Sequence, residues 1–266
     1  MPRATGPFTE IRGYDDREGT QKFLETTGYL LDAHRLAYRA IHRVSPKAMV
    51  GFATAPGSFY PQNPNSLLDR TAVNMFDTLY SLTLDNMVGS DRDFIGLNYY
   101  GRNKLELHMS VGQQIKSWLT RDKPFAIQWE TSAQRKQGER PREFYARGLY
   151  DLLLKFKSSG LPIIITENGI NDSTDKFREE FLVLHLKAVA DAIADGAYVQ
   201  GYMYWALTDT WEWDGFFSHF GLVEIDRENN LKRIMRPSAK TYSEIIKTKT
   251  LSRELQEKHK ELINLK

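Results

Sequence analysis

Apolar positions along this chain follow two patterns, the helical spacing of amphipathic helices and the short continuous runs of buried strands. Helical spacing of apolar residues predicts helices over 20–43, 66–87, 142–159 and 175–195, and a last helix after Arg236-Pro237-Ser238. Short apolar runs predict strands over 48–54, 93–100, 163–166 and 199–207. The stretch over 101–141 has neither pattern, so we expect a long irregular connection there.

Strands that alternate with helices in this way favour βαβ units and a parallel sheet, which places the chain in the α/β class. A TIM barrel has eight such units in about 250 residues. The length of 266 residues would suit a whole barrel. The short count of strong strands instead predicts half of a barrel with long loops.

Composition narrows the class of protein further. Hydrophobic residues make up 41% of the chain, which is typical of a globular protein with an ample core. The net charge of +2 gives no reason to expect nucleic acid or another strongly charged partner. The absence of cysteine excludes disulfides and thiolate metal sites. With no signal-like start and no apolar run of about 20 residues, we expect a cytoplasmic protein.

Polar and aromatic residues gather at the ends of the predicted strands, where α/β folds place their chemistry. The strand over 163–166 runs directly into Glu167, and Asn168-Gly169 is typical of the turn that leaves a strand. The last strand runs into YWALTDTWEW, which holds three of the five tryptophans. Aromatic faces beside carboxylates and amides suit a sugar, because rings stack on pyranose C–H faces and carboxylates accept hydroxyl hydrogen bonds.

Some of these residues also have a purely structural interpretation. Glu167 on its own could be a solvated loop carboxylate, the usual state of a glutamate. Trp211 is interpreted as a core residue at a strand end. Glu212 lies between two bulky rings, where solvation is poor, so its carboxylate needs partners.

Three motifs together resemble glycoside hydrolase family 1, the β-glucosidase family. They are TENG after an apolar strand, DFIGLNYY at 93–100, and YWALTDTWEW followed by FGLVEID. HLKAVADAIADGAYVQGYMYW is similar to the family's segment before its last strand. The resemblance covers about residues 20 to 245 and implies the C-terminal half of a TIM (β/α)8 barrel, about its strands 5–8.

The resemblance implies a role for each matching residue. Glu167 matches the nucleophile of a retaining β-glycosidase, and Tyr100 the tyrosine that hydrogen-bonds it. Asn98 matches a polar residue at the strand end, and Trp205 matches the platform under the sugar. Glu212 and Trp213 match the pair that binds sugar hydroxyls, and Phe220 matches the aromatic residue that closes the pocket. The loop EWDGFFSHFG is one residue shorter than the common family form, so the resemblance assigns no role to Ser218 or His219.

Two carboxyl groups about 5–5.5 Å apart perform the retaining reaction, so no metal or organic cofactor is implied. The six histidines show no metal-ligand spacing. The family's acid/base glutamate lies in an Asn-Glu-Pro motif, yet this sequence contains no Asn-Glu pair. Glu130 follows Trp129 and could stand in, but we interpret it as part of a loop.

These observations predict a chain made of a loop remnant at 1–19, a half-barrel at 20–248 and a charged helical tail at 249–266. The family's first four strands would lie upstream of Met1. Because a half-barrel exposes two strand edges, we expect a complementing N-terminal half or self-association. We also expect the isolated chain to lack ordinary hydrolase activity.

Two other functions stay open. The segment from WEWDGFF to LSREL is similar to the plant sensitive-to-freezing branch, which implies galactosyl transfer between galactolipids and peripheral contact with the chloroplast envelope. The tail's mixture of Lys, Arg and Glu is more typical of a solvated helix than of a lipid contact. Alternatively, a chain without the acid/base could be an inactive sugar-binding or interaction protein.

Overall fold

The structure is a computed structural model that describes residues 17–56, 58–77, 89–107, 125–131, 144–212 and 215–260. By its internal contacts the chain divides into two compact units. The first comprises residues 1–52, 61–94 and 105–127, and the second comprises 53–60, 95–104 and 128–266. Every site residue predicted from the sequence belongs to the second unit.

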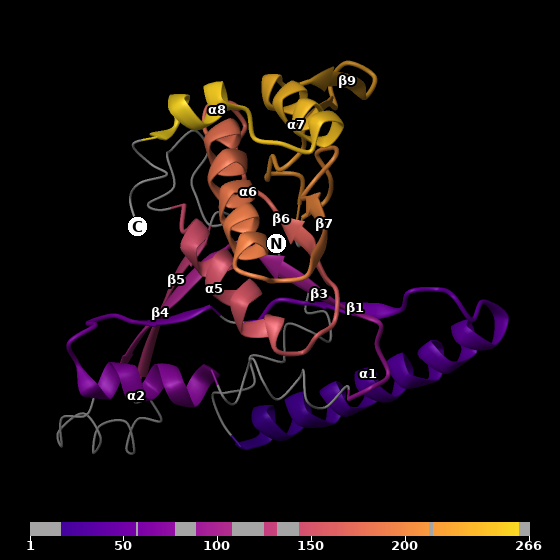
Figure 1. Cartoon of the computed structure of the whole chain (residues 1–266), viewed down its shortest axis with the longest axis vertical. Helices are drawn as coiled ribbons and strands as arrows, with labels where there is room; N and C mark the ends of the chain where they lie inside the picture. Colours follow the sequence, from indigo (N-terminus) through magenta and orange to yellow (C-terminus); the bar gives the residue numbers. More distant parts are fainter. Residues whose placement is uncertain are drawn as a thin grey trace. The chain divides into compact units, whose positions relative to one another are not determined.

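The four predicted strands form a four-stranded sheet in the order β1-β3-β6-β7 (Figure 1). They comprise Gly51–Thr54 (β1), Phe94–Tyr99 (β3), Ile163–Asn168 (β6) and Val199–Tyr204 (β7). β3 pairs with β6, and β6 with β7, both in parallel, as helical crossovers require. β6 is longer than predicted, so Glu167 and Asn168 lie inside the strand instead of in a turn.

Two helices, α5 (Ala146–Lys157) and α6 (Arg178–Ala194), pack against one another and cover one face of this sheet (Figure 1). Ile163 and Ile165 point into the core that these helices form with the sheet, and both are fully buried. Ile164 points to the opposite face and is only partly buried. β6 is therefore buried on the face that the helices cover and only partly buried on the other.

The first unit contains α1 (Arg17–Val44) and α2 (Leu67–Phe76). α1 begins at Arg17, inside the segment predicted as a loop remnant. The Tyr38 hydroxyl donates to Asp93 Oδ1 over 3.0 Å, which ties α1 to the residues before β3. Ser66 caps α2 by accepting from the Asp69 amide. The predicted continuation of α2 over 78–87 lies outside the described residues.

The stretch predicted as irregular contains regular structure. β2 (Phe59–Pro61), β4 (Gly101–Leu107) and β5 (Phe125–Thr131) form a three-stranded sheet in the order β2-β4-β5. Glu130 lies in β5, so interpreting its segment as a loop is wrong. The apolar-run criterion missed these strands because it detects buried strands, whereas strands with a polar face depend on pairing with distant partners.

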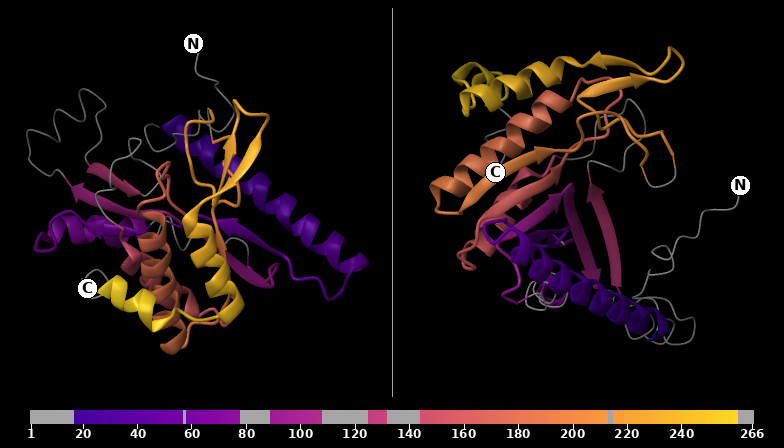
Figure 2. Two further views of the ribbon diagram at one scale, coloured as in Figure 1. Left: turned by 90° about the horizontal axis from the view of Figure 1, so that it is seen from above. Right: turned by 90° about the vertical axis from the view of Figure 1, so that its right-hand side faces the viewer.

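A hairpin that the sequence pattern also missed follows the aromatic loop. β8 (Val223–Asp226) and β9 (Lys232–Met235) pair antiparallel. They lead into α7 (Pro237–Thr248) and the short helix α8 (Arg253–Lys258), coloured yellow in Figure 2. Lys258 and His259 contact Glu179 of α6, which anchors the described part of the predicted tail. None of the described helices is long and apolar enough to cross a bilayer.

Candidate active site

The carboxyl ends of β3, β6 and β7 meet at one edge of the sheet because the three strands are parallel and adjacent. Asn98 is level with Glu167 across the β3–β6 pair. Asn168 is level with Tyr204 across the β6–β7 pair, so Trp205 follows directly beyond it. This register brings the three predicted strand-end motifs together.

Glu167 is half-buried and is held by the residue that follows β3. The Tyr100 hydroxyl donates to Glu167 Oε2 over 2.7 Å. Burial and this hydrogen bond to the carboxylate both raise the pKa of Tyr100 above its ordinary value. The phenol therefore keeps its proton at neutral pH and fixes the orientation of the carboxylate, a group suited to nucleophilic attack.

A second carboxylate, Glu212, is half-buried beside the indole of Trp205. The Trp205 Nε1–H donates to Glu212 Oε1 over 3.0 Å. Burial raises the pKa of Glu212, and the charge of Glu167 adds to this rise, while the Trp205 hydrogen bond opposes it.

Phe220 contacts this group through the ring of Tyr100. Its ring lies edge-on to Tyr100, with 6.0 Å between the ring centroids, and its side chain is buried. Asn98 joins the group through a polar contact, since the Thr166 hydroxyl donates to Asn98 Oδ1 over 2.7 Å. The contacts thus connect Tyr100 with Glu167 and Phe220, and Trp205 with Glu212.

Two predicted positions need separate comment. Trp213 lies outside the described residues, so the structure adds nothing to its predicted role. Trp211 is 56% exposed and packs edge-on against Phe216, so its interpretation as a core residue is wrong. The side chain of its neighbour Glu212 accepts from Trp205 instead.

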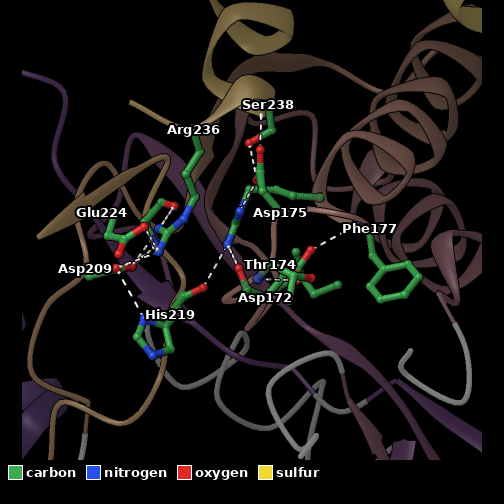
Figure 3. Close-up of polar contacts among 12 residues, drawn as sticks. Asp172, Thr174, Asp175, Phe177, Asp209, His219, Glu224, Arg236 and Ser238 are labelled. Atoms are coloured by element: carbon green, nitrogen blue, oxygen red, sulfur yellow. Dashed lines mark hydrogen bonds and ion pairs between the residues drawn. The ribbon is translucent and has the colours of Figure 1, made fainter. Parts of the chain in front are cut away.

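A buried ion pair holds the loop that carries Phe220 (Figure 3). Arg236 donates to both Asp209 oxygens, over 3.0 and 2.8 Å, and to the Gly221 carbonyl over 2.6 Å. Burial alone would raise the pKa of Asp209, but hydrogen bonds from His219 and Arg236 hold it below its ordinary value. The charged carboxylate therefore stays available to bind the segment around Phe220.

A second buried guanidinium fastens the same segment to the loop after β6. Arg178 donates to the carbonyl oxygens of Asp172 and His219, over 2.6 and 2.8 Å. It also forms an ion pair with Asp175, whose carboxylate accepts from the Ser238 amide and hydroxyl (Figure 3). These contacts fix the backbone directly before Phe220.

Residues 81–251 match the family model described as Glycosyl hydrolase family 1. The chain belongs to this family. Among the described residues of this family 1 chain, no group of three or more His, Cys, Asp or Glu side chains is placed to hold a metal ion.

Curated relatives agree with this assignment. The chain is 36% identical over 228 residues to the galactolipid galactosyltransferase SFR2, chloroplastic, of Arabidopsis thaliana, with 83% of this chain and 33% of that protein covered. It is 33% identical to a β-galactosidase of Sulfolobus acidocaldarius, with 85% of this chain and 48% of that protein covered. The chain therefore spans between a third and a half of the length of these relatives.

Solved structures show the same partial match. The β-glycosidase from Pyrococcus horikoshii superposes with a TM-score of 0.76 at 31% identity, covering 90% of this chain and 56% of that chain. A structure from Fervidobacterium pennivoraus gives 0.73, covering 88% of this chain and 50% of that chain. The predicted fold class is confirmed: this chain has part of the family 1 TIM-barrel fold.

Several residues that shape this family 1 site were missed from the sequence, notably Asn168, Arg178, Asp209 and Arg236. Asp209 lies between Trp205 and Trp211 in the aromatic segment YWALTDTWEW, and an acid in such a segment was the one available signal. Arg236 was interpreted only as part of a helix start. Nothing in the local pattern around these residues says that they meet, because their partners are distant in the sequence.

Proposed function

We propose that this chain carries the nucleophile side of a retaining β-glycosidase site that acts on β-glucosides or β-galactosides. The observation that supports this best is the 2.7 Å hydrogen bond from Tyr100 to Glu167, at the carboxyl edge of the sheet. Support also comes from Phe220, which contacts Tyr100, and from the hydrogen-bonded pair of Trp205 and Glu212, because these are the aromatic and acceptor groups that a sugar needs.

In the proposed reaction Glu167 attacks the anomeric carbon as the bond from that carbon to the aglycone oxygen breaks. A proton from the acid/base goes to the leaving oxygen, and the sugar remains esterified to Glu167. Water then attacks the same carbon, gives a proton back to the base and releases Glu167. Trp205 supports the sugar, Glu212 and Trp213 bind hydroxyls, Phe220 closes the pocket, and Asn98 contributes a polar contact.

The acid/base is the part for which this chain offers no matching motif, since the sequence contains no Asn-Glu pair. Glu212 accepts the hydrogen bond of the Trp205 indole, so we assign it to sugar binding. We therefore propose that efficient hydrolysis needs a complementing N-terminal half or self-association.

A suitable test is the intact mass of the protein after incubation with 2-deoxy-2-fluoro-β-glucosides and β-galactosides that carry a good leaving group. Such reagents need no acid, so we expect one adduct that maps to Glu167 and is absent in Glu167→Gln. No adduct on a folded chain would contradict the proposal and favour an inactive sugar-binding protein. The sugar that labels faster identifies the preferred glycoside.

A second function, galactosyl transfer between galactolipids at a membrane surface, is favoured by the 36% identity to the Arabidopsis galactosyltransferase. The two functions differ in what releases the sugar from Glu167. Faster release of a labelled galactosyl-enzyme by galactolipid vesicles than by buffer would support transfer. Equal release in both would support hydrolysis.

A further inference from the structure

Asn168 is a fully buried polar residue next to Glu167, and its hydrogen bonds cross both neighbouring strands. Its Nδ2 donates to the Tyr99 carbonyl on β3 over 2.6 Å. Its Oδ1 accepts from the Tyr202 hydroxyl on β7 over 2.6 Å. Its own carbonyl accepts from the Trp205 amide over 3.1 Å. One residue of β6 thus binds both adjacent strands.

These contacts occur where the regular strand ladder is interrupted. The register shifts between Leu97 and Asn98 on β3 and between Ile165 and Asn168 on β6. The first lies on β3 beside Glu167 and the second encloses Glu167 on β6, so main-chain pairing alone holds this stretch less firmly than a regular ladder would. The Asn168 amide supplies side-chain links at that place.

Two of these three links end at or directly beside a residue of the candidate site. Tyr99 precedes Tyr100, Asn168 follows Glu167, and Trp205 is itself bound through its amide. The hydroxyl of Tyr100 must stay 2.7 Å from Glu167, although the two residues come from different strands. A misplacement of about 1 Å in such a site can cost a hundredfold in rate.

We propose that Asn168 is a positioning residue that sets the hydrogen bond between Tyr100 and Glu167. This inference rests on the proposed function for its rate measurements, and it deepens that function by adding a residue outside the predicted set. The competing explanation is that Asn168 only stabilises the sheet. The two explanations differ in whether the effect of Asn168 depends on the Tyr100 hydroxyl.

The experiment is a double-mutant cycle on the rate of Glu167 labelling by the fluoroglycoside, with Asn168→Ala, Tyr100→Phe and both. We expect Asn168→Ala to slow labelling about 100-fold when Tyr100 is present and less than tenfold in Tyr100→Phe. Equal losses in both backgrounds, or no loss, would overturn the inference. If Asn168→Ala does not fold, Tyr202→Phe removes one of its partners, and we expect a loss of about fivefold that again depends on Tyr100.

A second readout needs no sugar. The Cζ resonance of Tyr100, observed in protein with ¹³C-labelled tyrosine and assigned with Tyr100→Phe, reports the hydrogen bond to Glu167. In Asn168→Ala it should move toward its position in Glu167→Gln, and an unchanged resonance would contradict the inference. If the unaltered chain forms no adduct, the proposed function fails while this resonance still decides the role of Asn168.

The matched control is Asn103→Ala on β4. Asn103 is buried like Asn168, and its Oδ1 has no hydrogen-bond partner in the part of the chain that is described. We expect the labelling rate to stay within twofold of that of the unaltered protein. The Tyr100 resonance should stay at the position that it has in the unaltered protein. Thermal unfolding of each variant separates lost folding from lost positioning.

Discussion

At the scale of single residues, Gly169 shows how closely the backbone is packed behind Glu167. A Cβ atom added to Gly169 would lie 1.9 Å from the carbonyl oxygen of Trp205. The contact is with main chain, so no side-chain rotation can relieve it. Glycine is needed here because the ends of β6 and β7 approach one another.

We expect Gly169→Ala to lower the free energy of unfolding by about 3 kcal/mol, because the added methyl group must push the two strand ends apart. Urea unfolding monitored by circular dichroism measures this. Gly28→Ala is the control, since an added Cβ in α1 meets nothing within 4 Å, and it should raise helix stability by up to about 1 kcal/mol. Equal effects of the two changes would contradict the packing described here.

At the scale of elements, the loop between β7 and β8 is held by a buried ion pair in addition to its apolar contacts. Asp209 belongs to that loop, and Arg236 lies directly before α7. Both side chains are almost fully buried, so the pair joins two elements at a place where an unpaired charge would be costly. Glu224 of β8 lies 3.6 Å from the same guanidinium and supports it from the solvent side.

Asp209→Asn should lower the free energy of unfolding by about 3–5 kcal/mol at pH 7, because Arg236 then remains buried without its charged partner. The folded pKa of Asp209 is lowered, so its contribution is complete above the unfolded value of about 4 and declines as the pH falls below it. The difference in unfolding free energy between Asp209→Asn and the unaltered protein should therefore shrink from pH 5 toward pH 2. Urea titrations across that range measure it.

Asp32→Asn serves as the control for this pH series, because Asp32 is an exposed carboxylate of α1 with 70% of its side chain accessible. It should change stability by less than about 0.5 kcal/mol. If the difference in unfolding free energy between Asp209→Asn and the unaltered protein stays constant with pH, the role given to the Asp209 charge is contradicted.

At the scale of the whole molecule, the chain has the proposed nucleophile Glu167 but no Asn-Glu pair that would match the family's acid/base motif. It spans between a third and a half of the length of its curated relatives, and its sheet ends at β1 and β7. General acid–base catalysis contributes about 10²–10⁴-fold to such reactions. Chemistry that bypasses this step should therefore be the activity that the chain shows by itself.

With a dinitrophenyl β-glycoside, whose leaving group needs no proton, we expect sodium azide to raise turnover at least about tenfold. Azide attacks the glycosyl-enzyme without a general base, so the product should be the β-glycosyl azide with retained configuration. Chromatography and proton NMR of the product measure both effects. Rapid hydrolysis of unactivated glycosides, insensitive to azide and abolished in Glu167→Gln, would show instead that the chain has its own acid/base.

Local patterns predicted the helices from the helical spacing of their apolar residues, and the buried strands from their short continuous apolar runs. The order of parallel strands then implied that residues 98–100, Glu167 and Trp205 meet at one edge. The β4–β5 strands and the β8–β9 hairpin could not be predicted in this way, because their residues are not arranged in buried runs and their stability comes from pairing. Trp211 was misassigned because its apolar character says nothing about which side of the loop it occupies.

The sequence by itself determined the α/β class, the family motifs and the identity of the carboxylate at the end of β6, since these depend on residue type and short-range spacing. Only the tertiary structure decided which groups hold that carboxylate. The bonds of Asn168 to Tyr99 and Tyr202, and of Arg236 to Asp209, join residues between 27 and 69 positions apart. A buried polar group must find a partner, but the chain path alone decides which one it finds.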